Sequence, residues 1–279
     1  MSTSAEERRE RAGAGMRLAA AVVAAWILLA LLGPWVAGDA QAIALERILA
    51  PPGSPGCPLG CDDLGRSQLA RLLAGARVSL EVALASVAVS ATLGTALGLA
   101  AGYAGGRWDA AAMRLVDVFL AFPGILLAIA LAAVLGPGIG NVIVALAAVG
   151  WTGYARLARA QALALRGREH VLAAAALGTP PARIVARHVL PLAWAPLLVE
   201  ATFGLAAAVV AEAGLSFLGL GVQPPQASWG AMIRDGVRYL LVAPHAVLVP
   251  GLALAAVVLA VNLLGDALRD RLDVRLRER

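Results

Sequence analysis

Long uncharged apolar windows alternate with short arginine-bearing segments along this 279-residue chain. A helix needs about 20 mostly apolar residues to cross the hydrocarbon core of a bilayer, because each residue adds only about 1.5 Å. The pattern therefore predicts a series of membrane-spanning helices. The windows are Leu18–Gly38, Val82–Gly106, Val118–Ala155, Leu192–Leu220 and Tyr239–Gly265, of which only the fourth holds charged residues, Glu200 and Glu212.

The Val118–Ala155 window is too long for one span, and residues 136–141 interrupt it with the sequence GPGIGN. Clusters of glycine and proline mark turns, so this window predicts two helices. The total is then six, and the expected fold class is an all-α integral membrane protein with six transmembrane helices.

The composition supports a membrane protein. Hydrophobic residues make up 60% of the chain and charged residues only 15%, whereas soluble domains have about 25% charged residues. Such a chain lacks the polar side chains needed to cover a water-exposed surface. A soluble enzyme, a disordered protein and a fibrous repeat are therefore disfavoured.

All 23 basic residues are arginine. The absence of lysine excludes a P-loop site for ATP within this chain. The arginines lie between the apolar windows rather than in one basic patch, which argues against a nucleic-acid partner. With the N-terminus in the cytoplasm, 17 of the 23 arginines fall on the cytoplasmic side, as the positive-inside rule requires. Both termini are then cytoplasmic.

These spans divide the chain into five regions. The first window has 21 uncharged residues, more than the roughly 7–15 of a cleaved signal peptide, so we expect a retained anchor. The expected regions are a cytoplasmic tail (1–17), the anchor helix (18–38), an external loop with a helical pattern from Gly65 to Val78 (39–79), a five-helix core with a cytoplasmic loop at 156–190 (80–266), and a cytoplasmic C-terminal tail (267–279).

The cytoplasmic loop predicts a short helix–turn–helix. Four consecutive alanines, residues 173–176, favour a helix with little side-chain bulk. Gly178 favours a stop, and Pro180 and Pro181 favour a new start. A smooth helix of this kind suits close docking against another protein, and an ordinary amphipathic loop at the membrane surface is the alternative.

Four acids, Glu81, Asp117, Glu200 and Glu212, lie within or beside the predicted spans. Ionisable residues in a membrane are costly and are candidates for function. Glu81 and Asp117 each have an arginine about one helical turn away, which favours a position at the membrane interface. Glu212 is the candidate for a pathway or gating role, with a structural hydrogen bond as the alternative.

Glycines and cysteines leave two further questions open. Gly94, Gly98 and Gly102 recur every four residues, a spacing that allows close helix packing either within this chain or against a second subunit. Cys57 and Cys61 lie in the external loop, where a local disulfide is feasible but not required. With three histidines in the chain, no metal site is expected.

The cytoplasmic loop resembles the "EAA" loop of the inner-membrane subunits of binding-protein-dependent ABC importers. Ala173 and Ala174 match its two alanines, Gly178 its glycine, and Ile184 and Leu190-Pro191 its C-terminal part. The motif's glutamate position holds Leu172, and Glu169 lies one helical turn earlier.

The resemblance extends over about residues 57–276, to C-type permease subunits for dipeptides and oligopeptides. It rests on Pro58–Gly60, Asp62–Arg66, Gly75–Leu80, Leu115–Asp117, Ala121–Gly124, Ala211–Pro225 and Asn262–Asp270.

This resemblance implies a type I ABC importer permease fold in a bacterial-type inner membrane. It implies a heterodimer with a second permease subunit, two ATPase subunits that carry ATP and Mg²⁺, and an extracytoplasmic solute-binding protein. This chain itself binds no cofactor. The cargo would be a dipeptide, an oligopeptide or a related solute such as a nickel complex or glutathione. The residues expected to couple to the ATPases are Glu169, Leu172, Ala173, Ala174, Leu177, Gly178, Ile184 and Pro191.

Two other functional classes fit the sequence less well. An ion-coupled secondary transporter predicts two corresponding halves with broken helices, and the sequence shows no such symmetry. A membrane-embedded enzyme needs a nucleophile and base or a metal cluster within the spans, and no such motif is present.

Overall fold

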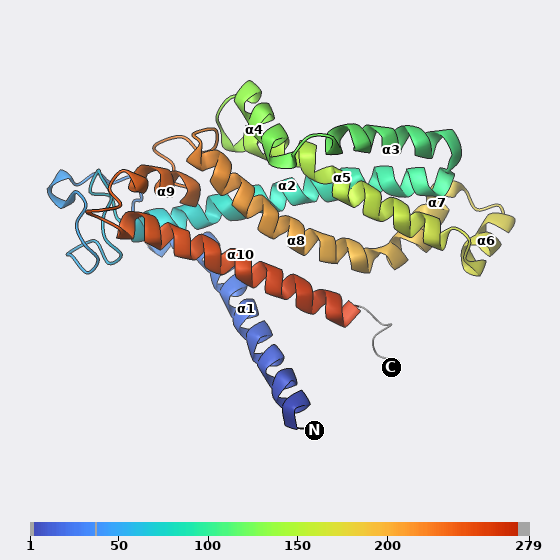
Figure 1. Cartoon of the computed structure of the whole chain (residues 1–279), viewed down its shortest axis with the longest axis horizontal. Coiled ribbons are helices and arrows are strands. Elements are labelled where there is room, and N and C mark those ends of the chain that lie inside the picture. Colours follow the sequence, from blue (N-terminus) through green and yellow to red (C-terminus); the bar gives the residue numbers. More distant parts are fainter. Residues whose placement is uncertain (1–2, 37, 273–279) are drawn as a thin grey trace.

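The computed structural model describes residues 3–36 and 38–272, so residues 273–279 of the predicted C-terminal tail lie outside the described residues. The regular elements of the described ranges are all helices (Figure 1). They are α1 (Thr3–Val36), the short 3-10 helix η1 (Leu45–Arg47), α2 (Gln68–Ala104), α3 (Gly106–Leu120), α4 (Gly124–Leu135), α5 (Ile139–Leu165), α6 (Glu169–Ala176), α7 (Pro181–Ile184), the π-helical turn η2 (Val185–Val189), α8 (Leu190–Phe217), α9 (Trp229–Val237) and α10 (His245–Leu272).

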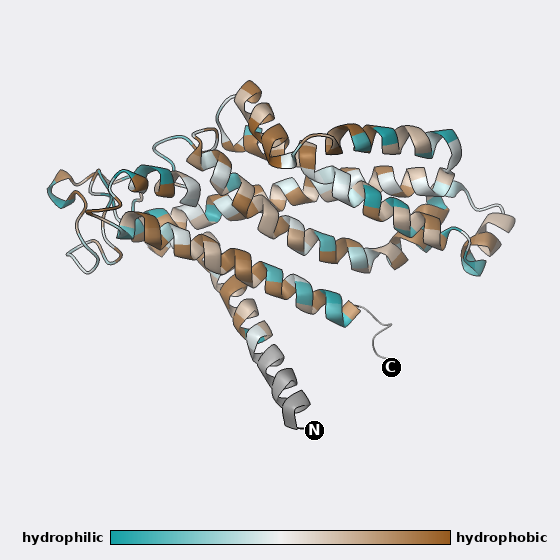
Figure 2. Ribbon diagram, in the orientation of Figure 1, coloured by the Kyte–Doolittle hydropathy of each residue, from teal (hydrophilic) through white to brown (hydrophobic). Residues whose placement is uncertain are grey.

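Five of these helical segments are long and apolar enough to cross a membrane. They are α1, α2, α5, α10 and the continuous segment from α7 through α8. The pair α3 and α4 forms a sixth candidate, which is bent by 83° at its break. Figure 2 shows the same division, with apolar residues along the long helices and polar residues gathered near their ends. The predicted all-α membrane fold with up to six spans is confirmed.

The predicted break at residues 136–141 is also confirmed. Gly136 and Gly138 adopt positive φ angles of 85° and 143° and separate α4 from α5. The Asn141 side-chain amide donates hydrogen bonds to the carbonyl oxygens of Leu135 and Gly136, at 2.9 and 3.0 Å. These bonds satisfy carbonyl groups at the end of α4 that have no partner within the helix.

The third span differs from the expectation. The sequence predicted one span in the first half of the Val118–Ala155 window, whereas the structure has two helices there, with α3 ending at Leu120 and α4 beginning at Gly124. Pro123 disfavours a helical conformation for the residue before it, which explains the position of the break. In Figure 1, α3 runs along α2 and α5, and the chain then bends sharply into α4, which packs against α5 through Ala128 and Ala132.

Two helix starts also differ from the predicted regions. Helix α1 begins at Thr3 rather than near Leu18, because the glutamates, arginines and alanines of the tail are good helix formers. Helix α2 begins at Gln68, with the Ser67 side chain accepting a hydrogen bond from the Ala70 amide. The helical pattern predicted in the external loop is therefore the start of α2, whose 37 residues span about 55 Å.

The glycine stripe packs within this chain. A Cβ atom added at Gly94, Gly98 or Gly102 would collide with the backbone of α5, at the carbonyl oxygens of Trp151, Ala155 and Arg159 respectively. Because these three positions of α2 carry no side chain, the backbones of α2 and α5 are in direct contact, as small residues allow in membranes. Of the two alternatives for the stripe, the structure shows packing within the subunit.

The molecule has two different ends (Figure 1). Residues 38–67 and α9 form one end, which we call the disulfide end because Cys57 and Cys61 are joined there. Helices α6 and α7 form the opposite end, which we call the hairpin end. The local disulfide that the sequence made feasible is therefore present between Cys57 and Cys61, and both cysteines are buried.

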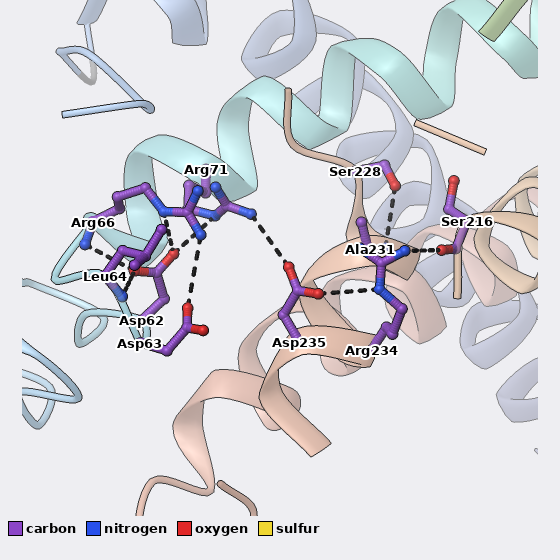
Figure 3. A network of polar contacts seen from close by, with 10 residues as sticks. All are labelled: Asp62, Asp63, Leu64, Arg66, Arg71, Ser216, Ser228, Ala231, Arg234 and Asp235. Atoms are coloured by element: carbon purple, nitrogen blue, oxygen red, sulfur yellow. Dashed lines mark hydrogen bonds and ion pairs between the residues drawn. The ribbon is translucent and has the colours of Figure 1, made fainter. Parts of the chain in front are cut away.

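Charged groups hold the disulfide end against α2 and α9 (Figure 3). The buried Asp62 carboxylate accepts from the Arg66 Nε at 2.7 Å and lies 3.3 Å from the Arg71 Nε. The Arg71 guanidinium also reaches Asp235 of α9, at 4.0 Å. Burial and the neighbouring Asp62 carboxylate raise the pKa of Asp63, which lies 3.7 Å from Arg66.

Candidate functional site

The hairpin end is built around Gly178. Helix α6 ends at Ala176, and Gly178 follows with a φ of +78°, a left-handed conformation that only glycine adopts easily. The amides of Gly178 and Thr179 donate to the carbonyl oxygens of Ala175 and Ala174, at 3.0 and 3.1 Å, and so close the end of the helix. Pro181 then occupies the first position of α7, where its missing N–H is harmless.

One face of the hairpin is buried. Val171 and Ile184 are each 1% exposed, and they pack together with Ala174 against Leu99 of α2 and Ala158 of α5. These contacts fix the orientation of the short helix α6 on the bundle. The sequence did not indicate Val171, although its spacing of three residues from Ala174 is typical of one helix face.

The opposite face is exposed and partly apolar. Leu172 is 55% exposed and Leu177 is 87% exposed. Six of the eight predicted coupling residues lie on the surface, and two are buried. The exposed residues are Glu169, Leu172, Ala173, Leu177, Gly178 and Pro191, and the buried ones are Ala174 and Ile184. The two motif alanines thus differ in environment, since Ala173 is exposed and Ala174 is buried against the bundle.

The hairpin joins a transmembrane helix without an intervening loop. Helix α7 continues through the π-helical turn η2 into α8, so the helical segment is unbroken from Pro181 to Phe217. His170 of α6 and His188 of η2 have ring centroids 6.3 Å apart across the hairpin. The hairpin and α8 are therefore joined by one continuous helical segment.

Glu212 lies toward the other end of α8 and is buried. Its carboxylate accepts hydrogen bonds from the Ser216 hydroxyl at 2.7 Å and the Ser79 hydroxyl at 3.2 Å. It thereby links α8 to α2. Of the two alternatives for Glu212, the structure shows the hydrogen bonds, and the gating role stays a prediction.

A second candidate region is a cavity of about 860 Å³ lined by α2, α4, α5, α8 and α10, which we call the membrane cavity. Most of its lining is apolar. Its polar lining side chains are Ser86, Ser90, Tyr154, Glu200 and Asn262. The sequence indicated only Glu200 among these, because a tyrosine or serine in an apolar helix gives no hydropathy signal comparable to a carboxylate.

Comparison with known proteins gives a consistent result. Residues 94–278 match the family model described as "Binding-protein-dependent transport system inner membrane component". The chain is 42% identical to the di/tripeptide transport system permease protein DppC of Pseudomonas aeruginosa over 257 residues, which cover 90% of this chain and 85% of that protein. It is 44% identical to the glutathione transport system permease protein GsiD of Escherichia coli over 218 residues, which cover 78% of this chain and 72% of that protein.

The fold also matches a solved structure. A chain of the MetNI methionine ABC transporter, in an inward-facing conformation, superposes with a TM-score of 0.59 at 20% sequence identity. The match covers 72% of this chain and 95% of that chain. The arrangement of helices is therefore that of a known transporter subunit.

Proposed function

This chain belongs to the family of binding-protein-dependent transport system inner membrane components, and we propose that it forms half of a peptide pathway through the membrane. It is a multi-pass permease subunit of an ABC importer. The proposed cargo is a dipeptide or oligopeptide, with glutathione or a nickel complex as related cargoes. The names of the relatives support the peptide class, since one transports di/tripeptides and another glutathione.

The observation that carries the proposal is the hairpin end. Its buried face is anchored by Val171 and Ile184, and its exposed face presents Leu172 and Leu177. An exposed apolar surface on a rigid element is typical of a protein contact. Because the hairpin continues into α8, a partner that moves it would also move a wall of the membrane cavity.

The proposed partners follow from this arrangement. Two ATPase subunits, which carry ATP and Mg²⁺, would each bind the hairpin of one permease subunit. The second permease subunit is a homologous chain that completes a heterodimer, and a solute-binding protein would deliver the cargo at the disulfide end. This chain needs no cofactor of its own for that role.

We propose that the hairpin end is cytoplasmic and the disulfide end extracytoplasmic, in a bacterial-type inner membrane. In Figure 1, α10 runs from the disulfide end toward the hairpin side, and the start of α1 points away from the disulfide end, which fits two cytoplasmic termini. The arginine distribution supports the same orientation. A disulfide at the opposite end fits an oxidising compartment.

The experiment is a Leu177→Glu substitution in the complete transporter. Leu177 is exposed, so a charge there leaves the fold intact while removing an apolar contact with a partner. We expect at least a tenfold loss of ATPase subunits that copurify with the permease, and loss of ATP hydrolysis stimulated by the loaded binding protein. Gly178→Trp adds bulk on the same surface and also strains the backbone at its positive φ, so we expect loss of assembly from both effects.

Leu241→Glu is the matched control, because Leu241 is 98% exposed but lies between α9 and α10 at the disulfide end. It should leave ATPase assembly unchanged. Full assembly and stimulation in Leu177→Glu would contradict the coupling role. Uptake by this chain reconstituted alone, driven by an ion gradient without ATP, would instead favour a secondary transporter.

A further inference from the structure

Glu200 of α8 and Tyr154 of α5 both line the membrane cavity, and each side chain reaches a glycine of the other's helix. A Cβ atom added at Gly204, one helical turn after Glu200, would lie 2.6 Å from the Tyr154 hydroxyl oxygen. A Cβ atom added at Gly153, next to Tyr154, would lie 3.0 Å from the Glu200 Oε1. Because Gly204 and Gly153 have no side chain, they leave room for the Tyr154 hydroxyl and the Glu200 carboxylate respectively.

The two groups lie within their helices, away from the ends. Glu200 is about ten residues from the start of α8, and Tyr154 is about eleven from the end of α5. Arg156, two residues after Tyr154, is the first residue of the predicted cytoplasmic loop, so the pair lies toward the hairpin side of the bilayer.

Two hydroxyls that line the cavity have no hydrogen-bond partner among the described residues. They belong to Tyr154, which is 3% exposed, and Ser86, which is 2% exposed. A buried hydroxyl without a partner costs about 1–3 kcal/mol. A polar ligand in the cavity would supply the missing partner.

Glu200 forms no ion pair with any basic residue that the structure describes. An unpaired carboxylate facing lipid would be strongly unfavourable, and such residues face a water-filled cavity or bind a ligand. The side chain lines a cavity large enough for a small peptide. Its charge selects a cationic group.

A metal ion fits this site poorly. Across residues 3–36 and 38–272, no three His, Cys, Asp or Glu side chains gather closely enough to hold a metal. Ca²⁺ and Mg²⁺ prefer several carboxylate or carbonyl oxygens, whereas the cavity offers one carboxylate and neutral groups. A protonated amine has three N–H donors and needs one carboxylate with one or two neutral acceptors.

We propose that Glu200 and Tyr154 bind the protonated amino group of the cargo as it passes through the membrane cavity. This inference rests on the proposed function, since it requires a cargo with a free amine, as peptides have. The carboxylate pairs with the ammonium group, and the Tyr154 oxygen accepts a second N–H. The permease then contributes to cargo selection after the binding protein has released the cargo.

The test is a competition between free and N-acetylated peptides. Cells that express the complete transporter receive an equimolar mixture of a defined library of dipeptides and tripeptides and its N-acetylated counterpart, and mass spectrometry measures the uptake ratio. Glu200→Gln should lower the ratio of free to acetylated peptide about tenfold, and Tyr154→Phe several-fold. Glu81→Gln, which removes an exposed acid of α2, should leave the ratio unchanged.

Three results would overturn the inference. The first is a ratio of free to acetylated peptide near one in the wild type, and the second is an unchanged ratio in Glu200→Gln. The third is a Glu200→Gln variant that no longer pairs with the second permease subunit, together with an unchanged ratio in Tyr154→Phe. If the wild-type transporter assembles and hydrolyses ATP but takes up neither form, the peptide cargo of the proposed function is itself wrong. Uptake with an unchanged ratio refutes only the amine site.

Discussion

Gly94 of α2 lies directly against the main-chain carbonyl of Trp151 in α5. Four and eight residues later, Gly98 and Gly102 repeat this contact one and two turns along the same pair of helices. Together they make α2 and α5 the most closely packed helices of the bundle. Any side chain at these positions must push the two backbones apart.

The first prediction follows from this contact. Gly98→Ala places a methyl group against the Ala155 carbonyl and should destabilise the protein by about 1–3 kcal/mol, as overpacking does. Thermal unfolding of the purified permease in detergent measures the effect. Gly251→Ala is the control, because a Cβ at Gly251 of α10 meets no atom within 4 Å. Equal melting temperatures for the two variants would contradict the packing.

The second prediction concerns the attachment of α3. The Asp109 carboxylate accepts two hydrogen bonds from the Arg159 guanidinium, at 2.5 and 2.7 Å. Both side chains are partly exposed, so we expect Asp109→Asn to cost about 1 kcal/mol. The expected result is faster amide hydrogen exchange in α3 of the variant than in α3 of the wild type. Arg114→Gln removes an exposed charge of the same helix and should leave exchange unchanged.

The third prediction concerns Glu212. Glu212→Ala leaves the hydroxyls of Ser79 and Ser216 without their acceptor and creates a cavity, so it should destabilise the protein by about 2–4 kcal/mol. Glu212→Gln keeps one acceptor oxygen and should lose less stability than Glu212→Ala. Thermal unfolding distinguishes them. If both variants melt like the wild type, the link between α8 and α2 contributes nothing to stability.

The fourth prediction concerns the disulfide. Cys57 and Cys61 should not react with maleimide until the protein is both reduced and unfolded, since they are bonded and buried. Replacing both by serine frees a loop of about five residues and should cost about 2 kcal/mol. Limited proteolysis tests this, since residues 38–67 should be cleaved faster in the double serine variant than in the wild type. Labelling of the native protein without reductant would disprove the bond.

The fifth prediction concerns pH. Because the pKa of Asp63 is raised by burial and by Asp62, its charged form is unfavourable in the folded protein. Stability from this group is present at low pH and is lost as the pH rises through the folded-state pKa. Asp63→Asn should therefore melt at a higher temperature than the wild type at pH 7.5, and the difference should shrink toward pH 4. A constant difference would contradict the shift.

Much of the fold could be predicted because hydropathy and turn residues act locally. The break at residues 136–141 and the turn at Gly178 both rest on glycines with positive φ, and both appear where expected. The bend between α3 and α4 was missed because residues on both sides of it are apolar and helical. Pro123 was the one local signal, and it competed with an uninterrupted hydropathy pattern.

The candidate sites were harder to predict because they depend on which faces meet. The adjacent residues Ala173 and Ala174 are the same amino acid, but Ala173 is exposed and Ala174 is buried. The glycine stripe identified a contact without identifying its partner. Glu200 was indicated by its charge, whereas its neighbour Tyr154 comes from a helix about 46 residues earlier, a relation that only the tertiary structure reveals.

The unbroken helix from Pro181 to Phe217 has a mechanical consequence. Its longest part, α8, has 28 residues and measures about 42 Å, so a tilt of about 5° at one end carries the other end about 4 Å sideways. If a partner moves the hairpin as proposed, a small rotation there would shift the far part of the cavity wall by that amount.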